Sequence, residues 1–315
     1  MSDQPLLHLA NLYSFRSEVE FEREIDYLLC RFSPVSLGDL AAWKLEHRPL
    51  PRRAFFLSFD DGFREMAEVV APLCRRKGVS ATFFLTTDFL DNQALGYRHK
   101  ASVLLSHLEQ LPANAAFQIT QKAAETHALT CGSDIRQFIL SLPHSQRTVL
   151  DETARLAGLD FQTYLKKQCP YLTTNQVREL HMQGFDIGAH SVDHPRYSEL
   201  TLSEQIRQTR DSVRFIEQNF HPKHRAFAFP FVSDGVDDNF YLQIFSERIC
   251  DIVFCIGQTP RNKSWPIVER FGIEGATNDP IWRILRNRRR RALRADIGRA
   301  ATPIKRLLRA GLGPK

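Results

Sequence analysis

The stretch that decides the fold is residues 55–62, FFLSFDDG, in which a short apolar run leads into two adjacent acids and a glycine. The apolar run predicts a buried strand, and Gly62 ends it. Residues 185–194, FDIGAHSVDH, are built in the same way, with His190 and His194 directly after the apolar residues. In α/β folds, catalytic groups collect where strands run into loops. One carboxylate and two imidazoles there predict a divalent-metal site with open coordination positions.

The sequence around the two acids alternates strand and helix patterns. Working outward from them, we expect a strand over 54–59, a helix over 65–76 and a strand rich in Thr and Phe over 80–86. The other expected elements are helices at 18–30, 174–183, 202–220 and 241–246, and strands at 6–9, 226–229, 252–255 and 269–273. This rhythm indicates a parallel sheet with helices outside it.

The rhythm stops between residues 91 and 171. This stretch is mostly polar, and helical patterns are expected near 101–111, 133–142 and 145–157. We interpret it as a helical insertion packed over or beside a barrel that the rest of residues 1–280 forms. Two interpretations stay open: a lid over the site, or a cap that only completes the packing.

The composition is that of a globular protein, since 43% of the 315 residues are hydrophobic. Six scattered cysteines without a CxxC pair favour reduced thiols in a cytoplasmic protein. We expect no secretory signal, because the first ten residues lack a basic region and an apolar region. We also expect no transmembrane helix, because no window approaches 18 uncharged apolar residues.

Positive charge is concentrated near the C-terminus. Residues 281–315 contain 12 lysines and arginines and one acid, Asp296, so this tail has a net charge of +11. The whole chain has a net charge of +6, so the remainder is mildly acidic at −5. The tail is predicted to be either a disordered, solvated segment or a basic amphipathic helix on an anionic membrane surface. Nucleic acid is the least favoured partner, because no base-reading fold accompanies the charge.

Each of the two motifs has a chemical and an ordinary explanation. Asp60 and Asp61 would point to opposite faces of a regular strand, but Gly62 permits a sharp turn that lets both converge. One carboxylate could then bind a metal while the other takes a proton from metal-bound water. Gly188 and Pro195 place the histidines in a strand-to-loop setting, where a turn can join their rings. Alternatively, Asp-Asp-Gly is a common turn, and eleven histidines make one HxxxH pair plausible by chance.

Taken together, the motifs resemble the polysaccharide deacetylase family, also called the NodB-homology or carbohydrate esterase 4 family. Its T/S-F-D-D-G and H-S/T-x-x-H segments stand here as SFDDG and HSVDH. Residues 78–85 resemble its G-x-x-A-T-F-F strand, and residues 227–231 (FAFPF) resemble an F-A-Y-P-Y variant of its third motif. The resemblance covers about residues 6–90 and 172–273. It implies an α/β fold, a distorted (β/α)7-type barrel, with the insertion and the tail outside it.

The resemblance also implies a role for each matching residue. Asp60 would be the general base, and Asp61, His190 and His194 would hold the metal. The backbone amide of Phe231 would help to stabilise an oxyanion.

Three further residues near the motifs, Tyr197, Phe229 and Pro230, are expected to line the site against the substrate. The two aromatic rings would do so by stacking on a sugar face, although such rings also serve as core.

Two departures from the family pattern stand out. The third motif usually has an arginine that steadies the catalytic acid, and Ala228 takes its place here. Arg225 and Arg270 are the candidates to replace it. The family's general acid is a histidine in an L-x-H motif near the C-terminus, but no histidine follows His224. The proton would then come from Asp60 after it is protonated, or from another carboxylic acid.

The sequence therefore predicts a metal-dependent hydrolase that removes an acetyl group, N-linked in preference to O-linked. Zinc is the expected metal, with cobalt, manganese, nickel and iron as alternatives. The substrate would be an acetylated sugar, glycan or glycolipid precursor of a bacterial cell envelope, met in the cytoplasm or at the inner membrane face. Two alternatives remain: a catalytically degenerate glycan- or membrane-binding protein on the same fold, and a metal hydrolase of another C–N bond. Release of acetate from the substrate would distinguish the predicted deacetylase from both of these alternatives.

Overall fold

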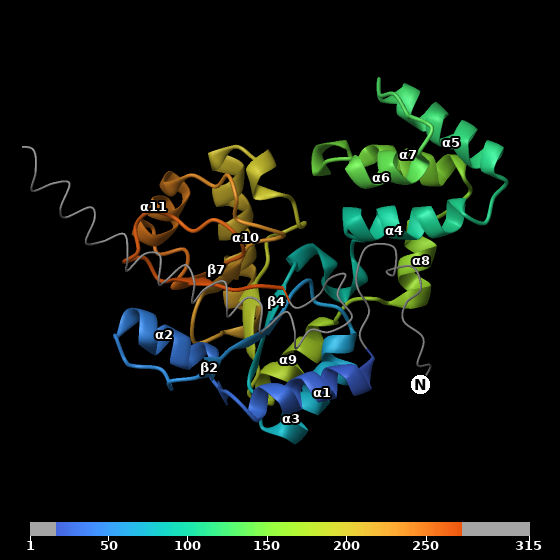
Figure 1. Ribbon diagram of the computed structural model, residues 1–315. Coiled ribbons are helices and arrows are strands. Elements are labelled where there is room, and N and C mark those ends of the chain that lie inside the picture. The colour runs from blue at the N-terminus through green and yellow to red at the C-terminus, as the bar shows by residue number, and fades with distance from the viewer. Residues whose placement is uncertain (1–16, 273–315) are drawn as a thin grey trace, which may run out of the picture. The chain divides into compact units, whose positions relative to one another are not determined.

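The computed structural model describes residues 17–272, and a parallel sheet forms its centre (Figure 1). Among these residues the main sheet has six strands in the order β3-β4-β5-β6-β7-β8, all parallel. The strands are β3 (Leu57–Phe59), β4 (Ala81–Leu85), β5 (Asp186–Ala189), β6 (Ala226–Ala228), β7 (Ile252–Cys255) and β8 (Ile267–Glu269). The spatial order follows the sequence order, and the sheet curls as part of a (β/α) barrel (Figure 1), as predicted, although with six strands in this part of the chain rather than about seven.

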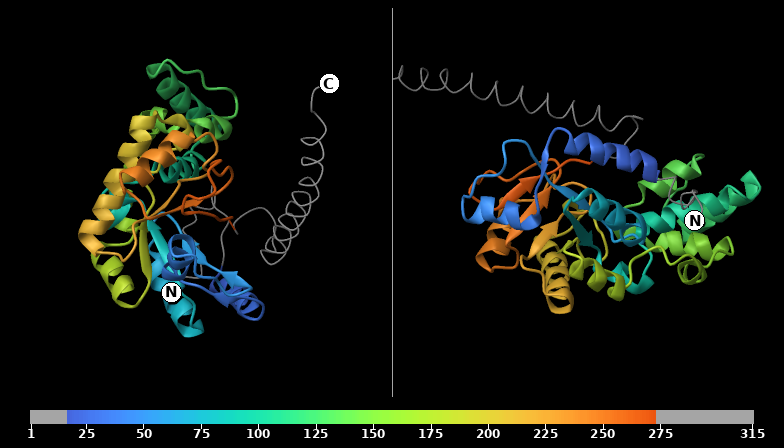
Figure 2. Two further views of the ribbon diagram at one scale, coloured as in Figure 1. Left: turned by 90° about the vertical axis from the view of Figure 1, so that its left-hand side faces the viewer. Right: turned by 90° about the horizontal axis from the view of Figure 1, so that it is seen from below.

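Helices cover the outside of the curled sheet (Figure 2). They are α1 (Glu18–Leu29), α3 (Ala71–Lys77), α9 (Thr174–Met182), α10 (Leu202–Phe220) and α11 (Asp238–Ser246), whereas α2 (Leu37–Leu45) packs on the inner face with Phe84 and Phe254. The predicted starts of α1, α9 and α10 are confirmed because each follows a capping box, with Ser17, Thr173 and Thr201 as N-caps. The predicted helix over 65–76 begins with a π-helical turn, η2 (Met66–Val70), before α3.

The single strand predicted over 54–59 is wrong. The chain forms β2 (Ala54–Phe55) and β3 instead, and Phe56 between them stacks on Phe254 in the core, ring centroids 5.2 Å apart. Strand β2 pairs with β1 (Ser33–Pro34) in a separate two-stranded sheet. The last predicted strand, 269–273, is also displaced, because β8 ends at Glu269.

The central strands are buried on both faces. Every residue of β4, β6 and β7 is buried, which is typical of parallel strands between helical layers. One core cluster joins Phe84 of β4 and Phe254 of β7 to apolar side chains of α2. This packing holds the carboxyl ends of the strands, where the motif residues lie, in fixed positions.

The insertion is helical, and its helices gather in one cluster, green in Figure 1. It follows a 3-10 segment, η3 (Thr87–Asn92), and consists of α4 (Tyr97–Leu108), α5 (Ala113–Thr126), α6 (Ile135–Ser141), η4 (His144–Gln146), α7 (Thr148–Leu156) and α8 (Phe161–Gln168). Helices α5 and α8 were not expected from the sequence. The insertion has its own buried cluster, which runs from Phe89 to Tyr171. Phe63 and Phe231, which flank the motifs, pack against that cluster, so the insertion reaches the site.

Two expectations lie outside the described residues, namely the strand at 6–9 and the tail at 281–315. In the part of the chain that the structure describes, residues up to Phe271 form one compact unit, which includes the insertion. No helix within residues 17–272 has the length and apolar character needed to cross a bilayer. All six cysteines fall in this range, and their thiols are free.

Candidate metal centre

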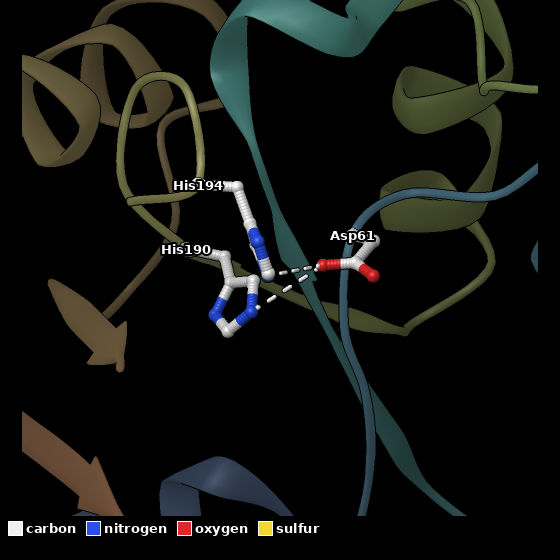
Figure 3. Close-up of side chains that lie close together, drawn as sticks. All are labelled: Asp61, His190 and His194. Atoms are coloured by element: carbon white, nitrogen blue, oxygen red, sulfur yellow. Dashed lines mark ion pairs between the residues drawn. The ribbon is translucent and has the colours of Figure 1, made fainter. Parts of the chain in front are cut away.

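Three side chains from distant parts of the chain meet at the carboxyl ends of β3 and β5 (Figure 3). One ligand atom from each of Asp61, His190 and His194 lies within 4.8 Å of the other two. Asp61 Oδ1 is 3.0 Å from His194 Nε2 and 3.4 Å from His190 Nε2. Among the described residues, these three form the only group of His, Cys, Asp or Glu that could hold a metal ion.

Unusual backbone conformations bring these residues together. Asp61 and Gly62 have φ of 74° and 81°, which turns the chain sharply at the end of β3. Ser191 and His194 have φ of 69° and 62°, and the Ser191 hydroxyl accepts a hydrogen bond from the His194 amide at 3.0 Å. Left-handed conformations of non-glycine residues are uncommon and gather at functional sites.

The ring of His190 is oriented by its neighbour in the sheet. Its Nδ1 lies 2.9 Å from the carbonyl oxygen of Ala228, and a carbonyl only accepts, so Nδ1 carries the hydrogen. Burial lowers the pKa of His190, which favours the neutral ring. The lone pair of Nε2 therefore points into the site, as in metal-binding histidines that donate their other N–H to a carbonyl.

Asp61 presents a buried oxygen to this lone pair. Its Oδ1 atom is buried and accepts no well-directed hydrogen bond from the described residues. Burial alone would raise the pKa of Asp61, but His194, His190 and Arg270 outweigh it and lower the pKa to about 2. A carboxylate oxygen and an imidazole lone pair repel each other unless a cation lies between them. The donor set, one oxygen and two nitrogens, thus fits a divalent metal such as zinc.

Asp60, the neighbouring acid, is held by Arg270. The guanidinium donates to Asp60 Oδ1 at 2.7 Å and to Oδ2 at 2.6 Å, and to the Ser58 hydroxyl at 3.0 Å. Asp60 Oδ2 also lies 3.8 Å from His190 Nε2, so this acid borders the metal centre. Of the two arginines that the sequence offered to steady Asp60, Arg270 is the one that contacts it.

Arg225, the other candidate, does not reach Asp60. It pairs with Asp251 at 2.6 Å and donates to the carbonyl of Arg248 at 2.6 Å. Its place just before β6 puts it at the opposite end of the strands from the metal centre, so this interpretation is wrong.

Phe231 follows β6 and borders the metal centre. Its φ is 58°, and its ring centroid lies 4.6 Å from that of His194 in an edge-on contact. The Phe231 amide donates none of the hydrogen bonds found within residues 17–272. This amide is therefore free to donate to an oxyanion, the role that the sequence resemblance implied.

The expected substrate contacts of Tyr197 and Phe229 are contradicted. Their exposed fractions are 0% and 1%, and the two rings pack against each other in the core with centroids 5.0 Å apart. The Tyr197 hydroxyl is bonded to that of Thr209 at 2.9 Å. Pro230 is buried as well. A ring without an exposed face cannot stack on a sugar.

The insertion adds residues that the sequence did not point to. Tyr97, His99 and Tyr171 line a small pocket together with Asp61 and His194. No motif signals this, because the insertion lies outside the segments that carry the sequence resemblance. His99 is buried, and its two ring nitrogens lie 3.0 and 3.1 Å from the hydroxyls of Tyr171 and Tyr164, so it belongs to a polar network inside the insertion.

A second histidine of the insertion contacts the motif loop directly. His144 Nε2 lies 3.2 Å from Asp193 Oδ2, and Asp193 directly precedes His194. Asp193 Oδ1 also accepts from Gln208 at 2.7 Å. The insertion is therefore tied to the loop that carries a candidate metal ligand.

The chain is similar in sequence to one protein family and in fold to solved structures. A family model described as polysaccharide deacetylase matches residues 47–244. Among solved structures, the Streptococcus pyogenes deacetylase PplD in complex with acetate is 14% identical, with 86% of each chain covered and a TM-score of 0.51, which shows a shared fold. IcaB from Ammonifex degensii is 14% identical, with 82% of this chain and 86% of that one covered and a TM-score of 0.49. Among curated proteins, none matches this chain in sequence.

Proposed function

The chain belongs to the polysaccharide deacetylase family, and on that premise we propose that it is a metal-dependent hydrolase that removes acetyl groups from a glycan or glycolipid precursor. The bond cleaved is the N-acetyl amide in preference to the O-acetyl ester. The observation that carries the proposal is the meeting of Asp61, His190 and His194, where a buried oxygen of Asp61 has no hydrogen-bond partner among residues 17–272.

The same three side chains would hold the ion. Imidazole nitrogens and a carboxylate oxygen suit zinc, and cobalt, manganese, nickel and iron accept the same donors. When bound, such an ion lowers the pKa of its water to about 7 and draws charge from the carbonyl oxygen.

The protein's own groups would move the protons and steady the charge. Asp60 would accept the proton of the attacking water while Arg270 keeps its carboxylate in one orientation. The Phe231 amide would donate to the oxyanion that forms from the acetyl carbonyl. The protonated Asp60 would then return its proton to the departing nitrogen. This sequence needs no second acid, which matters because no histidine follows His224.

Acetate release tests the proposal. Protein freed of metal and reloaded with zinc, cobalt or manganese would be assayed on N-acetylated and O-acetylated oligosaccharides. We expect acetate only with metal present. His190→Ala should lose both metal and activity, whereas Asp60→Asn should keep the metal and lose activity. Binding of metal without acetate release from any substrate would favour a degenerate glycan-binding protein, which the absence of the family's C-terminal histidine supports.

The proposed setting is a bacterial cell envelope precursor met in the cytoplasm or at the inner membrane face. The charge of residues 281–315, with 12 basic residues and one acid, supports an anionic membrane as a partner. Flotation with anionic liposomes, with and without these residues, tests this part. Equal flotation of the protein with and without residues 281–315 would contradict the proposed membrane contact.

A further inference from the structure

The rim of the metal centre carries an arginine that the proposed chemistry does not use. Arg196 lies two residues after His194, and its guanidinium carbon is 4.4 Å from the centroid of the Phe231 ring. Phe231 in turn contacts the ring of His194 edge-on at 4.6 Å. A full positive charge therefore lies one aromatic ring away from a candidate metal ligand.

Two other arginines of the barrel are paired with carboxylates. Arg270 makes a double contact with Asp60 and is 12% exposed, and Arg225 makes one with Asp251 and is 29% exposed. Arg196 differs from both. Its side chain is 41% exposed, and its ion pair with Glu199 is long, 3.9 Å from Nε to Oε1.

The contact with Phe231 covers one face of the Arg196 guanidinium, and the side chain as a whole stays 41% exposed. A guanidinium stacked on a ring keeps its N–H donors in its own plane, directed away from the ring. Those donors form a fork that matches the oxygens of a carboxylate or a phosphate. Sugar hydroxyls, which are neutral, make no comparable use of a full charge.

The insertion brings more positive charge to this rim. The Tyr97 ring lies 6.4 Å from that of Phe231, and the Arg98 guanidinium is 6.0 Å from the Tyr97 ring. Burial raises the pKa of Tyr97, and the charges of Arg98 and Arg196 oppose that rise, together with a hydrogen bond between Arg196 and the Tyr97 hydroxyl. Glu199 is the carboxylate at this rim, and it also accepts from the amide of His144 at 3.3 Å.

We propose that Arg196 binds an anionic group of the substrate, so that the acetylated sugar also carries a carboxylate or a phosphate. This inference rests on the proposed deacetylase function, because it places the sugar at the metal centre. It assigns Arg196 to substrate selection and not to the chemical step.

Binding of matched sugars tests the inference. Zinc-loaded protein would be titrated calorimetrically with N-acetylglucosamine, with N-acetylmuramic acid, which adds a carboxylate, and with N-acetylglucosamine 6-phosphate. We expect at least one acidic sugar to bind about tenfold more tightly than the neutral one, with a preference that weakens as salt rises. The acid that gains affinity identifies the anion.

Variants then assign the preference to one side chain. Arg196→Gln should bind neutral and acidic sugars within about twofold of each other, and Arg196→Lys should keep part of the preference because it keeps the charge without the fork. Arg178→Gln, a change of an exposed arginine on α9, is the matched control and should leave the preference unchanged. Equal or absent binding of all three sugars by the unaltered protein, or an intact preference in Arg196→Gln, would overturn the inference.

The two proposals fail in different ways. Acetate release without any preference for acidic sugars would keep the deacetylase and overturn the role of Arg196. Binding of acidic sugars through Arg196 without acetate release would overturn the hydrolase and keep the anion site.

Discussion

Arg270 and Asp60 form a double ion pair across 210 residues of sequence, with distances of 2.7 and 2.6 Å. Asp60 follows β3 and Arg270 follows β8, and these are the two edge strands of the six-stranded sheet. The pair therefore joins the carboxyl ends of the two edges where the curled sheet approaches closure. It links the shape of the sheet to the orientation of the proposed catalytic base.

This relationship predicts a loss of activity without a loss of metal. In Arg270→Gln the Asp60 carboxylate loses both of its hydrogen bonds to the Arg270 guanidinium, so we expect kcat to fall on the order of 100-fold while zinc content stays at the wild-type level. Arg270→Lys should be intermediate because lysine cannot make the double contact. Acetate-release kinetics and metal analysis measure the two effects.

Arg225→Gln is the control for this experiment. Arg225 also pairs with an acid, Asp251, but it lies before β6, far from Asp60. Its loss should reduce the stability of the fold and leave kcat within about threefold of that of the unaltered protein. Equal kcat in Arg270→Gln and the unaltered protein would contradict the positioning role.

The sequence predicted that Asp61, His190 and His194 meet, because their meeting follows from topology. The carboxyl ends of parallel strands lie at one edge, so Asp61 after one strand and His190 after another had to come near each other. Helix starts were predictable for a local reason, since a capping box such as Thr201 with Glu204 is complete within four residues.

Long-range pairs and burial were not predictable in this way. Whether Arg225 or Arg270 reaches Asp60 depends on how far the sheet curls, which no local pattern encodes. Tyr197 and Phe229 show the same limit, because an aromatic residue near a motif suits a sugar and a core equally well. The structure places both in the core.

The contact between His144 and Asp193 predicts energetic coupling between the insertion and the motif loop. The two side chains are mostly shielded, 10% and 28% exposed, and their atoms are 3.2 Å apart. In a double-mutant cycle with His144→Ala and Asp193→Asn, we expect a coupling energy of about 1 kcal/mol, because both groups are partly desolvated. Urea unfolding of the four proteins at pH 6 measures it.

A matched pair on the surface serves as comparison. Arg207 and Asp211, 3.8 Å apart on α10 and 58% and 48% exposed, should couple by no more than about 0.3 kcal/mol. If the His144 pair coupled no more strongly than this one, the insertion would not be held to the loop through these side chains.

Asp251 predicts a dependence of stability on pH. Burial acts to raise its pKa, but the hydrogen bonds and charge of Arg225 outweigh burial and lower the pKa below its usual value. A carboxyl whose pKa is lower in the folded protein stabilises the fold above its unfolded pKa, about 3.9, and loses that contribution as pH falls through the folded pKa. Asp251→Asn should therefore cost about 1–3 kcal/mol at pH 7, and this cost should shrink as pH falls below about 3.9.

Urea unfolding of both proteins from pH 7 to pH 3 measures this difference. Asp211→Asn is the control, because it removes an exposed acid that lies 3.8 Å from Arg207. Its free energy of unfolding should stay within about 0.5 kcal/mol of that of the unaltered protein at each pH. A constant deficit of Asp251→Asn across the range would show that its charge is not what stabilises the fold.

Gly188 predicts that packing within β5 controls the metal centre. A methyl group at this position would lie 2.5 Å from the ring of Phe84 and 3.1 Å from the carbonyl oxygen of Ala226. Both neighbours belong to buried strands on either side of β5, so β5 must move to accept Gly188→Ala, at a cost of about 1–3 kcal/mol. Because His190 follows two residues later, zinc affinity should fall on the order of tenfold.

Gly132→Ala, where a methyl group meets nothing within 4 Å, should change neither stability nor zinc affinity. Calorimetric zinc titration and urea unfolding of the two variants check this. Unchanged affinity in a destabilised Gly188→Ala would mean that the motif loop, and not the strand, fixes the position of His190.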